Sequence, residues 1–342
     1  MDIIATVGPK TMDKWVIKEL IENGVNTLRL NCAHFNKDEF ERVINYAKSI
    51  NSEIHILVDL SGKKVRISKK LKYIYKVYNE QEVFFCGEDY YNSLNNKELG
   101  EKKYIPLNIN AEKIKRSKIE SLSIKDNTMN FQILDVKEGI IKTKVMKGGI
   151  IRAGKGCNIS TINDNERIIS KKDKDNILWA INNDLDIICQ SFVESKQDID
   201  EIIRFIGYKE EEKKYDIWAK IETPKGINNI NDIITAVDTV VIGRGDLVAE
   251  AGILESVLLQ EKAIKIVKSR NKRIIIATHI LNSMKDGNLA TLPEIESIYE
   301  FINKGVDGFL LAGETSIGRA PIQTIKFLKN VIKYYKKDIK SE

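Results

Sequence analysis

The sequence has few of the residues that build zinc sites or disulfide frameworks. It contains four cysteines, none of them spaced as a CxxC motif, and only three histidines. We therefore expect neither type of site and interpret the cysteines as inert packing residues. No apolar run is long enough to span a bilayer, and the first residues lack the basic start and apolar core of a signal peptide. These absences predict a cytoplasmic protein with no membrane partner.

Concentrated charge of one sign is also absent. The formal net charge is only +6, and the lysines are scattered through the 342 residues. A nucleic-acid partner is not expected, because no basic stripe or known binding module is present. The sequence is 42% hydrophobic and 30% charged, which is typical of a globular protein with an ample core. A mildly positive surface would still attract phosphorylated small molecules.

The sequence does contain a regular alternation of apolar runs and amphipathic segments. The apolar runs predict strands at Ile3–Val7, Val25–Leu30, Ile54–Leu60, Asp186–Ser191, Asp216–Ile221, Val240–Ile242, Arg273–Thr278 and Val306–Leu311. The amphipathic segments predict helices at Asp13–Asn23, Lys37–Ile50, Asp173–Asn183, Lys196–Ile206, Leu254–Arg270, Pro293–Lys304 and Pro321–Tyr335. Eight strands, each followed by a helix or a connection, indicate an α/β fold of the (β/α)8 TIM barrel type.

One connection, after the third strand, is far longer than the others. It contains short alternating runs at Glu82–Cys86, Thr128–Leu134, Ile140–Val145 and Gly149–Ile151. We interpret 68–165 as a small β-rich domain inserted into the barrel, which leaves 1–67 and 166–336 as the two barrel parts and 337–342 as a solvated tail. Within the insert, the polar segment Asp89–Lys103 is interpreted as a mobile loop. A patch at Asn110–Lys118 has a helical pattern.

Polar residues follow the predicted strands at the ends where barrel active sites lie. Lys220 and Glu222 are two residues apart on the fifth strand and therefore share one face. Asp246 follows the sixth strand, so the two carboxylates can converge. Magnesium accepts one or two carboxylates and completes its shell with water and phosphate oxygens. Each acid alone could equally be a solvated or salt-bridged carboxylate, and Lys220 alone could be an ordinary ion-pair partner.

Other polar residues near these strand ends suit an anionic substrate. Arg29 and Arg66 carry planar guanidinium groups that match phosphate. The backbone amides at Gly245 could hold a carboxylate. His34 is either a packed polar residue or a ligand contact. The pattern indicates a metal site beside a phosphorylated or enolic substrate.

Several ordered motifs resemble those of the pyruvate kinase family, and together they cover almost the whole chain. They are Ile4-Ala5-Thr6-Val7-Gly8-Pro9, Leu28-Arg29-Leu30-Asn31-Cys32-Ala33-His34, Val58-Asp59-Leu60-Ser61-Gly62-Lys63-Lys64-Val65-Arg66, Lys155-Gly156-Cys157-Asn158-Ile159, Ala219-Lys220-Ile221-Glu222, Arg244-Gly245-Asp246-Leu247, Ala277-Thr278-His279-Ile280-Leu281-Asn282-Ser283-Met284 and Ala312-Gly313-Glu314-Thr315. The resemblance implies phosphoryl transfer from phosphoenolpyruvate to ADP.

The resemblance also implies roles at the metal and phosphoenolpyruvate sites. Glu222 and Asp246 would bind Mg²⁺ (or Mn²⁺). Lys220 would lie over the transferring phosphoryl group, and Arg29 would contact the phosphate of phosphoenolpyruvate. Backbone groups around Gly245, Asp246 and Thr278 would hold its carboxylate, with the Thr278 hydroxyl near the carbon that is protonated.

On the acceptor side, the resemblance places Pro9, His34, Arg66 and Lys155 toward the nucleotide, ADP or ATP. Family members that need potassium bind it partly through an Asn and an Asp, which are present here as Asn31 and Asp59. They carry a Glu where this chain has Lys64. Potassium-independent members resemble this chain at that position, so we expect the Lys64 ammonium to replace the ion and K⁺ not to be required.

Some departures from the family pattern leave alternatives open. The family's C-terminal regulatory domain has no counterpart in this sequence, so we expect a monomer or homodimer. Phe35 replaces a glycine, and a turn of the inserted domain reads Lys125-Asp126-Asn127. These changes keep open a phosphoenolpyruvate- or enolate-handling enzyme with another acceptor or a lyase activity. A non-catalytic regulatory or binding protein is the third reading, against which the complete set of site residues argues.

Overall fold

The computed structural model describes residues 1–124, 128–159, 169–207 and 215–338. The turn at 125–127, the domain boundary expected at 165–166 and residues 339–342 of the expected tail lie outside these ranges. Within them, no helix is both long and apolar enough to cross a membrane. The chain divides into two compact units, one of residues 1–62, 168–247 and 254–342, the other of residues 63–167 and 248–253. The first is a barrel and the second contains the inserted sheets.

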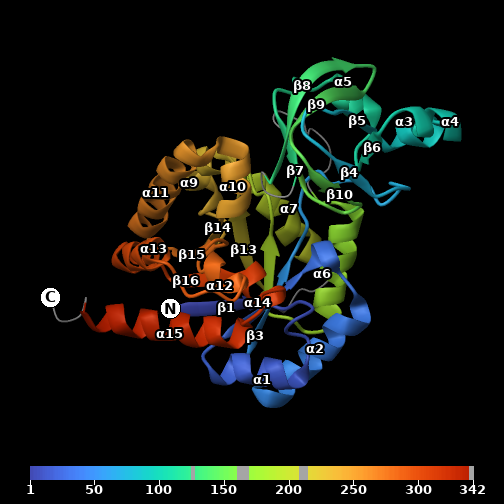
Figure 1. Cartoon of the computed structure of the whole chain (residues 1–342). Coiled ribbons are helices and arrows are strands. Elements are labelled where there is room, and N and C mark those ends of the chain that lie inside the picture. The colour runs from blue at the N-terminus through green and yellow to red at the C-terminus, as the bar shows by residue number, and fades with distance from the viewer. Residues whose placement is uncertain (125–127, 160–168, 208–214, 339–342) are drawn as a thin grey trace. The chain divides into compact units, whose positions relative to one another are not determined.

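Eight parallel strands close into the predicted barrel, which confirms the fold class (Figure 1). In chain order the strands are β1 (Asp2–Thr6), β2 (Thr27–Asn31), β3 (His55–Asp59), β12 (Ile187–Gln190), β13 (Asp216–Ile221), β14 (Thr239–Gly243), β15 (Arg273–Ala277) and β16 (Gly308–Leu311). The barrel closes where β1 pairs with β16, with Asp2 opposite Gly308. The insertion separates β3 from β12, yet these two strands are paired neighbours.

The predicted helices form at close to the expected positions. They are α1 (Lys14–Glu22), α2 (Lys37–Ile50), α6 (Lys171–Asn182), α7 (Lys196–Gly207), α11 (Ile253–Ser269), α13 (Leu292–Asn303) and α15 (Pro321–Asp338). Short helices that the periodicity did not predict follow several strands, namely η1 (Cys32–His34), α8 (Pro224–Asn228), α9 (Ile230–Ile233), α10 (Arg244–Ala251), α12 (Asn282–Lys285) and α14 (Gly313–Ser316). One or two turns contain too few residues to show a 3.6-residue period.

The barrel interior changes from apolar to polar along the strands. Ile4, Leu57 and Trp218 belong to one buried cluster that fills the interior. Two residues further along the same strands, on the same face, come Thr6, Asp59 and Lys220. The two-residue period of a strand therefore directs polar side chains inward at the carboxyl end of the barrel, above an apolar floor.

The second unit contains two sheets, as a β-rich insertion requires. The larger has the order β11-β7-β8-β9-β5-β6, and the smaller pairs β10 with β4. Their strands are β4 (Tyr75–Val77), β5 (Glu82–Gly87), β6 (Tyr104–Leu107), β7 (Leu122–Ile124), β8 (Met129–Lys137), β9 (Ile140–Lys147), β10 (Gly149–Ile151) and β11 (Cys157–Ile159). The helical patch near residue 110 is confirmed as α5 (Ala111–Lys115).

The prediction of a mobile loop at Asp89–Lys103 is wrong. This segment contains α3 (Glu88–Ser93) and α4 (Asn96–Glu101). A reciprocal capping box of Asn95 and Glu98 starts α4, and Leu99 is buried in a small cluster with Cys86, Tyr91 and Tyr104. The polar sequence did not reveal these helices because each is short and contributes few side chains to that cluster.

Replacing the tryptophan in the barrel floor tests whether this interior carries the stability of the fold. Trp218 is 1% exposed, whereas Trp15 on α1 is 64% exposed. We expect Trp218→Ala to lower the free energy of unfolding by about 3–5 kcal/mol. The matched control Trp15→Ala should change it by no more than about 0.5 kcal/mol. Urea unfolding of both variants measures the difference, and equal losses would contradict the assignment.

Candidate active site

The Asp59 carboxylate, at the end of β3, is the centre of the polar cluster. Arg29 donates to its Oδ2 from Nε at 2.7 Å and from Nη2 at 2.5 Å. The Lys220 ammonium lies 2.8 Å from Oδ2 and 3.1 Å from Oδ1. The Ser191 hydroxyl donates to Oδ1 at 2.7 Å, and Arg29 also donates from Nη1 to Thr6 Oγ1 at 2.8 Å. One carboxylate thus positions both cations that the family resemblance relates to the phosphoryl group.

Burial makes this charge cluster interdependent. Asp59 is 1% exposed and Lys220 is 8% exposed. Burial by itself raises the pKa of Asp59, but the Lys220 and Arg29 cations and the Ser191 hydrogen bond outweigh it and lower the pKa to about 2. Burial likewise opposes the charge of Lys220, but the Asp59 and Glu222 carboxylates raise its pKa above the ordinary value. Both groups are therefore ionised at neutral pH.

The two predicted metal ligands originate from neighbouring strands. β13 pairs in parallel with β14, with Ile221 opposite Ile242. Glu222 follows β13, and its Oε1 lies 3.7 Å from Lys220 Nζ. A Cβ at Gly243 would lie only 2.6 Å from that Oε1, so the carboxylate rests against the last residue of β14. Helix α10 begins at Arg244, directly after β14, and Asp246 lies in its first turn.

This donor set suits Mg²⁺ better than a metal held wholly by protein. Among the residues described, no group of three or more His, Cys, Asp or Glu side chains could hold a metal ion. Magnesium needs only one or two carboxylates, because water and substrate phosphate supply its other oxygens. Glu222 is 3% exposed and adjoins a cation that would contact the same phosphate. The pair of acids fits the ion, and their ligation of it stays a prediction.

Thr278 lies directly after β15, one residue beyond the end of that strand. Its φ is +67°, in the left-handed region. Its hydroxyl accepts a hydrogen bond from the Gly245 amide at 2.9 Å and donates one to the Ala277 carbonyl at 2.6 Å. The Gly245 amide, which we expected to hold a carboxylate, therefore already has a partner, and binding of a substrate carboxylate there stays a prediction.

The other barrel residues predicted from the sequence lie at the end of β2 or shortly after β1 and β2. Pro9 and His34 are exposed, as ligand contacts require. Asn31 accepts a hydrogen bond from the Ala33 amide at 3.0 Å and so caps η1. Asn31 is opposite Asp59 in the register of β2 and β3. The two residues assigned to a former potassium site are thus adjacent, although Asp59 also binds two cations.

Three predicted residues belong to the second unit. The Lys64 side chain packs over Gly156, where a Cβ would lie 2.4 Å from Lys64 Cε. Arg66 donates from Nη1 to the Gly154 carbonyl at 3.3 Å. Its Nε is buried and has no hydrogen-bond partner among the residues the structure describes. Lys155 is half-buried, and its carbonyl accepts from the Ile67 amide at 2.8 Å.

Sequence reasoning missed residues that act on the site through other residues. Ser191 and Phe192 follow β12, and the Phe192 amide donates to Glu222 Oε2 at 3.1 Å. Arg244 donates to backbone carbonyls after β15. Ser191 is recognisable as a polar residue at the end of the fourth predicted strand, but its hydrogen bond to Asp59 is not. The Phe192 contact is made by backbone, and the Arg244 contacts follow from a side-chain direction that the sequence does not give.

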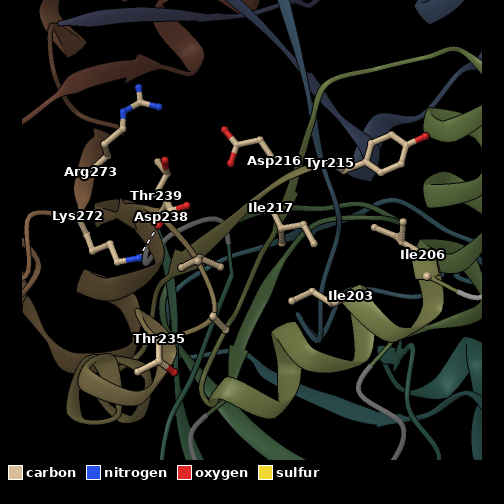
Figure 2. Close-up of a pocket in the computed structure, with 13 residues that line it drawn as sticks. Ile203, Ile206, Tyr215, Asp216, Ile217, Thr235, Asp238, Thr239, Lys272 and Arg273 are labelled. Atoms are coloured by element: carbon tan, nitrogen blue, oxygen red, sulfur yellow. Dashed lines mark hydrogen bonds and ion pairs between the residues drawn. The ribbon is translucent and has the colours of Figure 1, made fainter. Parts of the chain in front are cut away.

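A cavity of about 610 Å³ lies at the opposite end of the strands (Figure 2). Asp216, Thr239 and Arg273, the first residues of β13, β14 and β15, line it. At its edge Lys272 Nζ lies 2.5 Å from Asp238 Oδ1, as the dashed line shows. Barrel chemistry belongs to the carboxyl ends of the strands, so we assign the active site to the cluster around Asp59 and not to this cavity.

Comparison with known proteins identifies the family to which the chain belongs. A family model described as the barrel domain of pyruvate kinase matches residues 1–325. A pyruvate kinase of Thermotoga maritima is 30% identical over 98% of this chain and 71% of its own length. One of Buchnera aphidicola subsp. Baizongia pistaciae is 30% identical over 96% of this chain and 68% of its own length. One of Thermococcus litoralis is 29% identical over 97% and 68%.

The family model covers nearly the whole chain, and the barrel carries its charged cluster at the end where barrel enzymes do chemistry. This protein therefore belongs to the pyruvate kinase family of phosphotransfer enzymes.

Proposed function

We propose that this protein transfers a phosphoryl group from phosphoenolpyruvate to ADP and releases pyruvate and ATP. The observation that carries the proposal is the pairing of Arg29 and Lys220 on the buried Asp59 carboxylate, beside Glu222. This places two cations and a metal-type carboxylate at one strand end. Phosphoryl transfer depends mainly on positioning and charge neutralisation, which such a cluster supplies.

In the proposed reaction, the bond between phosphorus and the enol oxygen breaks as a terminal oxygen of ADP bonds to phosphorus. Arg29 orients the phosphate, and the Lys220 ammonium stabilises the charge that develops on the phosphoryl group and on the enolate oxygen. The enolate then takes a proton at its methylene carbon, near the Thr278 hydroxyl, and becomes pyruvate. Each cation is fixed before substrate arrives, so little reorganisation is needed during the reaction.

We assign Glu222 and Asp246 to Mg²⁺ (or Mn²⁺), which would neutralise phosphate charge when bound. Pro9, His34, Arg66 and Lys155 are assigned to the nucleotide, and the exposed positions of Pro9 and His34 are compatible with such contacts. We propose residues 68–165 as the inserted domain, which carries Lys155, whereas Arg66 lies just before it. A cytoplasmic location and a monomeric or homodimeric state complete the proposal.

The change to phenylalanine at position 35 does not favour a different acceptor. The Phe35 ring packs edge-on against Trp179 at 5.0 Å and against Phe40 at 5.4 Å between ring centroids. Phe40 lies on α2 and Trp179 on α6, so Phe35 joins two barrel helices. Aromatic packing accounts for this residue, and we retain ADP as the acceptor.

The reaction and the role of Lys220 are tested together. Supplied with phosphoenolpyruvate, Mg²⁺ and ADP, the protein should form pyruvate and ATP in equal amounts, and no pyruvate without ADP. Lys220→Met should lower kcat by about 100- to 1,000-fold, because a preorganised charge is lost. The control Lys262→Met removes a surface lysine that contacts Asn228 and should keep wild-type turnover. Binding of phosphoenolpyruvate without turnover by the wild-type protein would refute the proposal.

Asp59→Asn tests whether one carboxylate organises both cations. We expect kcat to fall by about 100-fold as Arg29 and Lys220 lose their shared partner. Because the folded-state pKa of Asp59 is about 2, below its ordinary 3.8, its stabilisation is complete above about pH 4 and is lost as the pH falls toward 2. Urea unfolding from pH 7 to pH 2 should show this loss in the wild-type protein and a smaller one in the variant. An unchanged kcat, or identical pH profiles, would contradict the role.

We further propose that K⁺ is not required, because the Lys64 ammonium replaces it. Adding K⁺ at constant ionic strength should change kcat by less than about tenfold, a factor equivalent to 1.4 kcal/mol. Lys64→Glu should create a dependence on K⁺ larger than this, whereas the neighbouring substitution Lys63→Glu should not. A strong K⁺ activation of the wild-type protein would overturn the idea.

A further inference from the structure

The backbone at Thr278 and His279 adopts a conformation that these residues disfavour. Their φ angles are +67° and +55°. Left-handed backbone is a genuine outlier for a β-branched residue such as threonine. Such a conformation persists only where the surrounding structure imposes it. These two residues must therefore be held by specific contacts.

The guanidinium of Arg244 supplies those contacts. It donates to the Thr278 carbonyl from Nε at 3.0 Å and from Nη2 at 2.8 Å. Its Nη2 also donates to the His279 carbonyl. Three hydrogen bonds from one planar group fix the direction of two consecutive carbonyls, and a lysine ammonium lacks the rigid fork needed to reproduce this geometry.

Arg244 is itself held in place. Its guanidinium lies over the Phe301 ring of α13, with Cζ 5.3 Å from the ring centroid. Burial lowers its pKa to about 10, and the Glu314 carboxylate opposes this shift, so it remains a cation at neutral pH. Glu314 also accepts a hydrogen bond from the Ile280 amide at 3.3 Å. Arg244 thus binds the carbonyls of Thr278 and His279, and Glu314 binds the amide of the next residue, Ile280.

The position of Arg244 in the chain connects this segment to the metal side of the site. Arg244 begins α10 and directly follows β14. The next residue, Gly245, donates its amide to the Thr278 hydroxyl at 2.9 Å, and the one after is Asp246. Three consecutive residues therefore hold the Thr278 carbonyl, orient its hydroxyl and provide a carboxylate for the metal.

We propose that Arg244 is a positioning residue for the protonation step: it imposes the left-handed backbone at Thr278 and His279 and fixes the Thr278 hydroxyl relative to Asp246. This inference rests on the proposed function, because the reacting carbon is that of enolpyruvate. Arg244 itself does not contact substrate and acts through Thr278. Loss of Arg244 should impair proton transfer more than binding of phosphoenolpyruvate.

The test compares Arg244→Met and Arg244→Lys with the control Arg273→Met. Arg273 is at the opposite end of β15, bridges to Asp2 and lies over Trp218. Exchange of pyruvate methyl protons in deuterated water, with Mg²⁺ and ATP, follows the proton step alone. We expect Arg244→Met to slow this exchange and kcat by about tenfold or more, with KM for phosphoenolpyruvate within about threefold of wild type. Arg244→Lys should recover only part of the rate, and Arg273→Met should keep all of it.

Coupling to Thr278 separates positioning from general destabilisation. If Arg244 acts through Thr278, adding Arg244→Met to Thr278→Ala should cost much less than it does in the wild-type protein, since interacting residues are non-additive. Multiplicative losses, or an unchanged exchange rate in Arg244→Met, would overturn the proposal.

A readout independent of activity distinguishes this proposal from the proposed function. Amide hydrogen–deuterium exchange of the segment 277–281 should be faster in Arg244→Met and unchanged in Arg273→Met. If the wild-type protein shows neither turnover nor pyruvate exchange, the proposed function fails, and this measurement still decides whether Arg244 holds the segment. Equal amide exchange in wild type and Arg244→Met would refute the proposal that Arg244 holds the segment. Should Arg244→Met not fold, the same measurements on Arg244→Lys decide.

Discussion

The site depends on one buried carboxylate that satisfies two cations. Removing either partner of a buried ion pair leaves an uncompensated charge in a medium that solvates it poorly, which is strongly destabilising. Arg29, Lys220 and Asp59 therefore maintain one another at the barrel end. The ammonium and the guanidinium are charged, dehydrated and oriented without any substrate. A phosphate group that binds there would contact donors that are already ordered, because folding has fixed the conformations of these two side chains.

The same cluster is a direct result of strand periodicity. Every second residue of β3 and β13 faces the barrel interior. Two residues after the apolar Leu57 and Trp218 of the floor, Asp59 and Lys220 therefore face the same interior. A further step of two along β13 reaches Glu222. The charged side chains lie at the carboxyl end of the barrel, and the apolar side chains that stabilise the fold lie in the layer below them. The fold can therefore tolerate the buried charges of Arg29, Asp59, Lys220 and Glu222, because they lie at the end of the core.

Much of this organisation follows from the sequence. The alternation of apolar and amphipathic segments predicted every barrel strand, because the hydrophobic pattern of each strand and helix is contained in its own stretch of sequence. The strand-end rule also selected Arg29, Lys220 and Glu222. What the sequence could not give is which side chains meet. Asp59 was interpreted through a potassium site, whereas its closest contacts are with Lys220 and Arg29, residues distant in the chain. Arg244 and the helices within Asp89–Lys103 were missed because tertiary contacts define them.

The sequence separation of these contacts has a consequence for how the site assembles during synthesis. Asp59 and Arg29 are 30 residues apart, but Asp59 and Lys220 are 161 residues apart, on either side of the insertion. A growing chain can therefore pair Asp59 with Arg29 early, and it lacks the second cation until β13 has been made. Contacts of such long range form late because loop closure must precede them. The charge cluster is thus assembled by closure of the barrel, and a chain whose barrel has not closed lacks the cluster to which we assign the reaction.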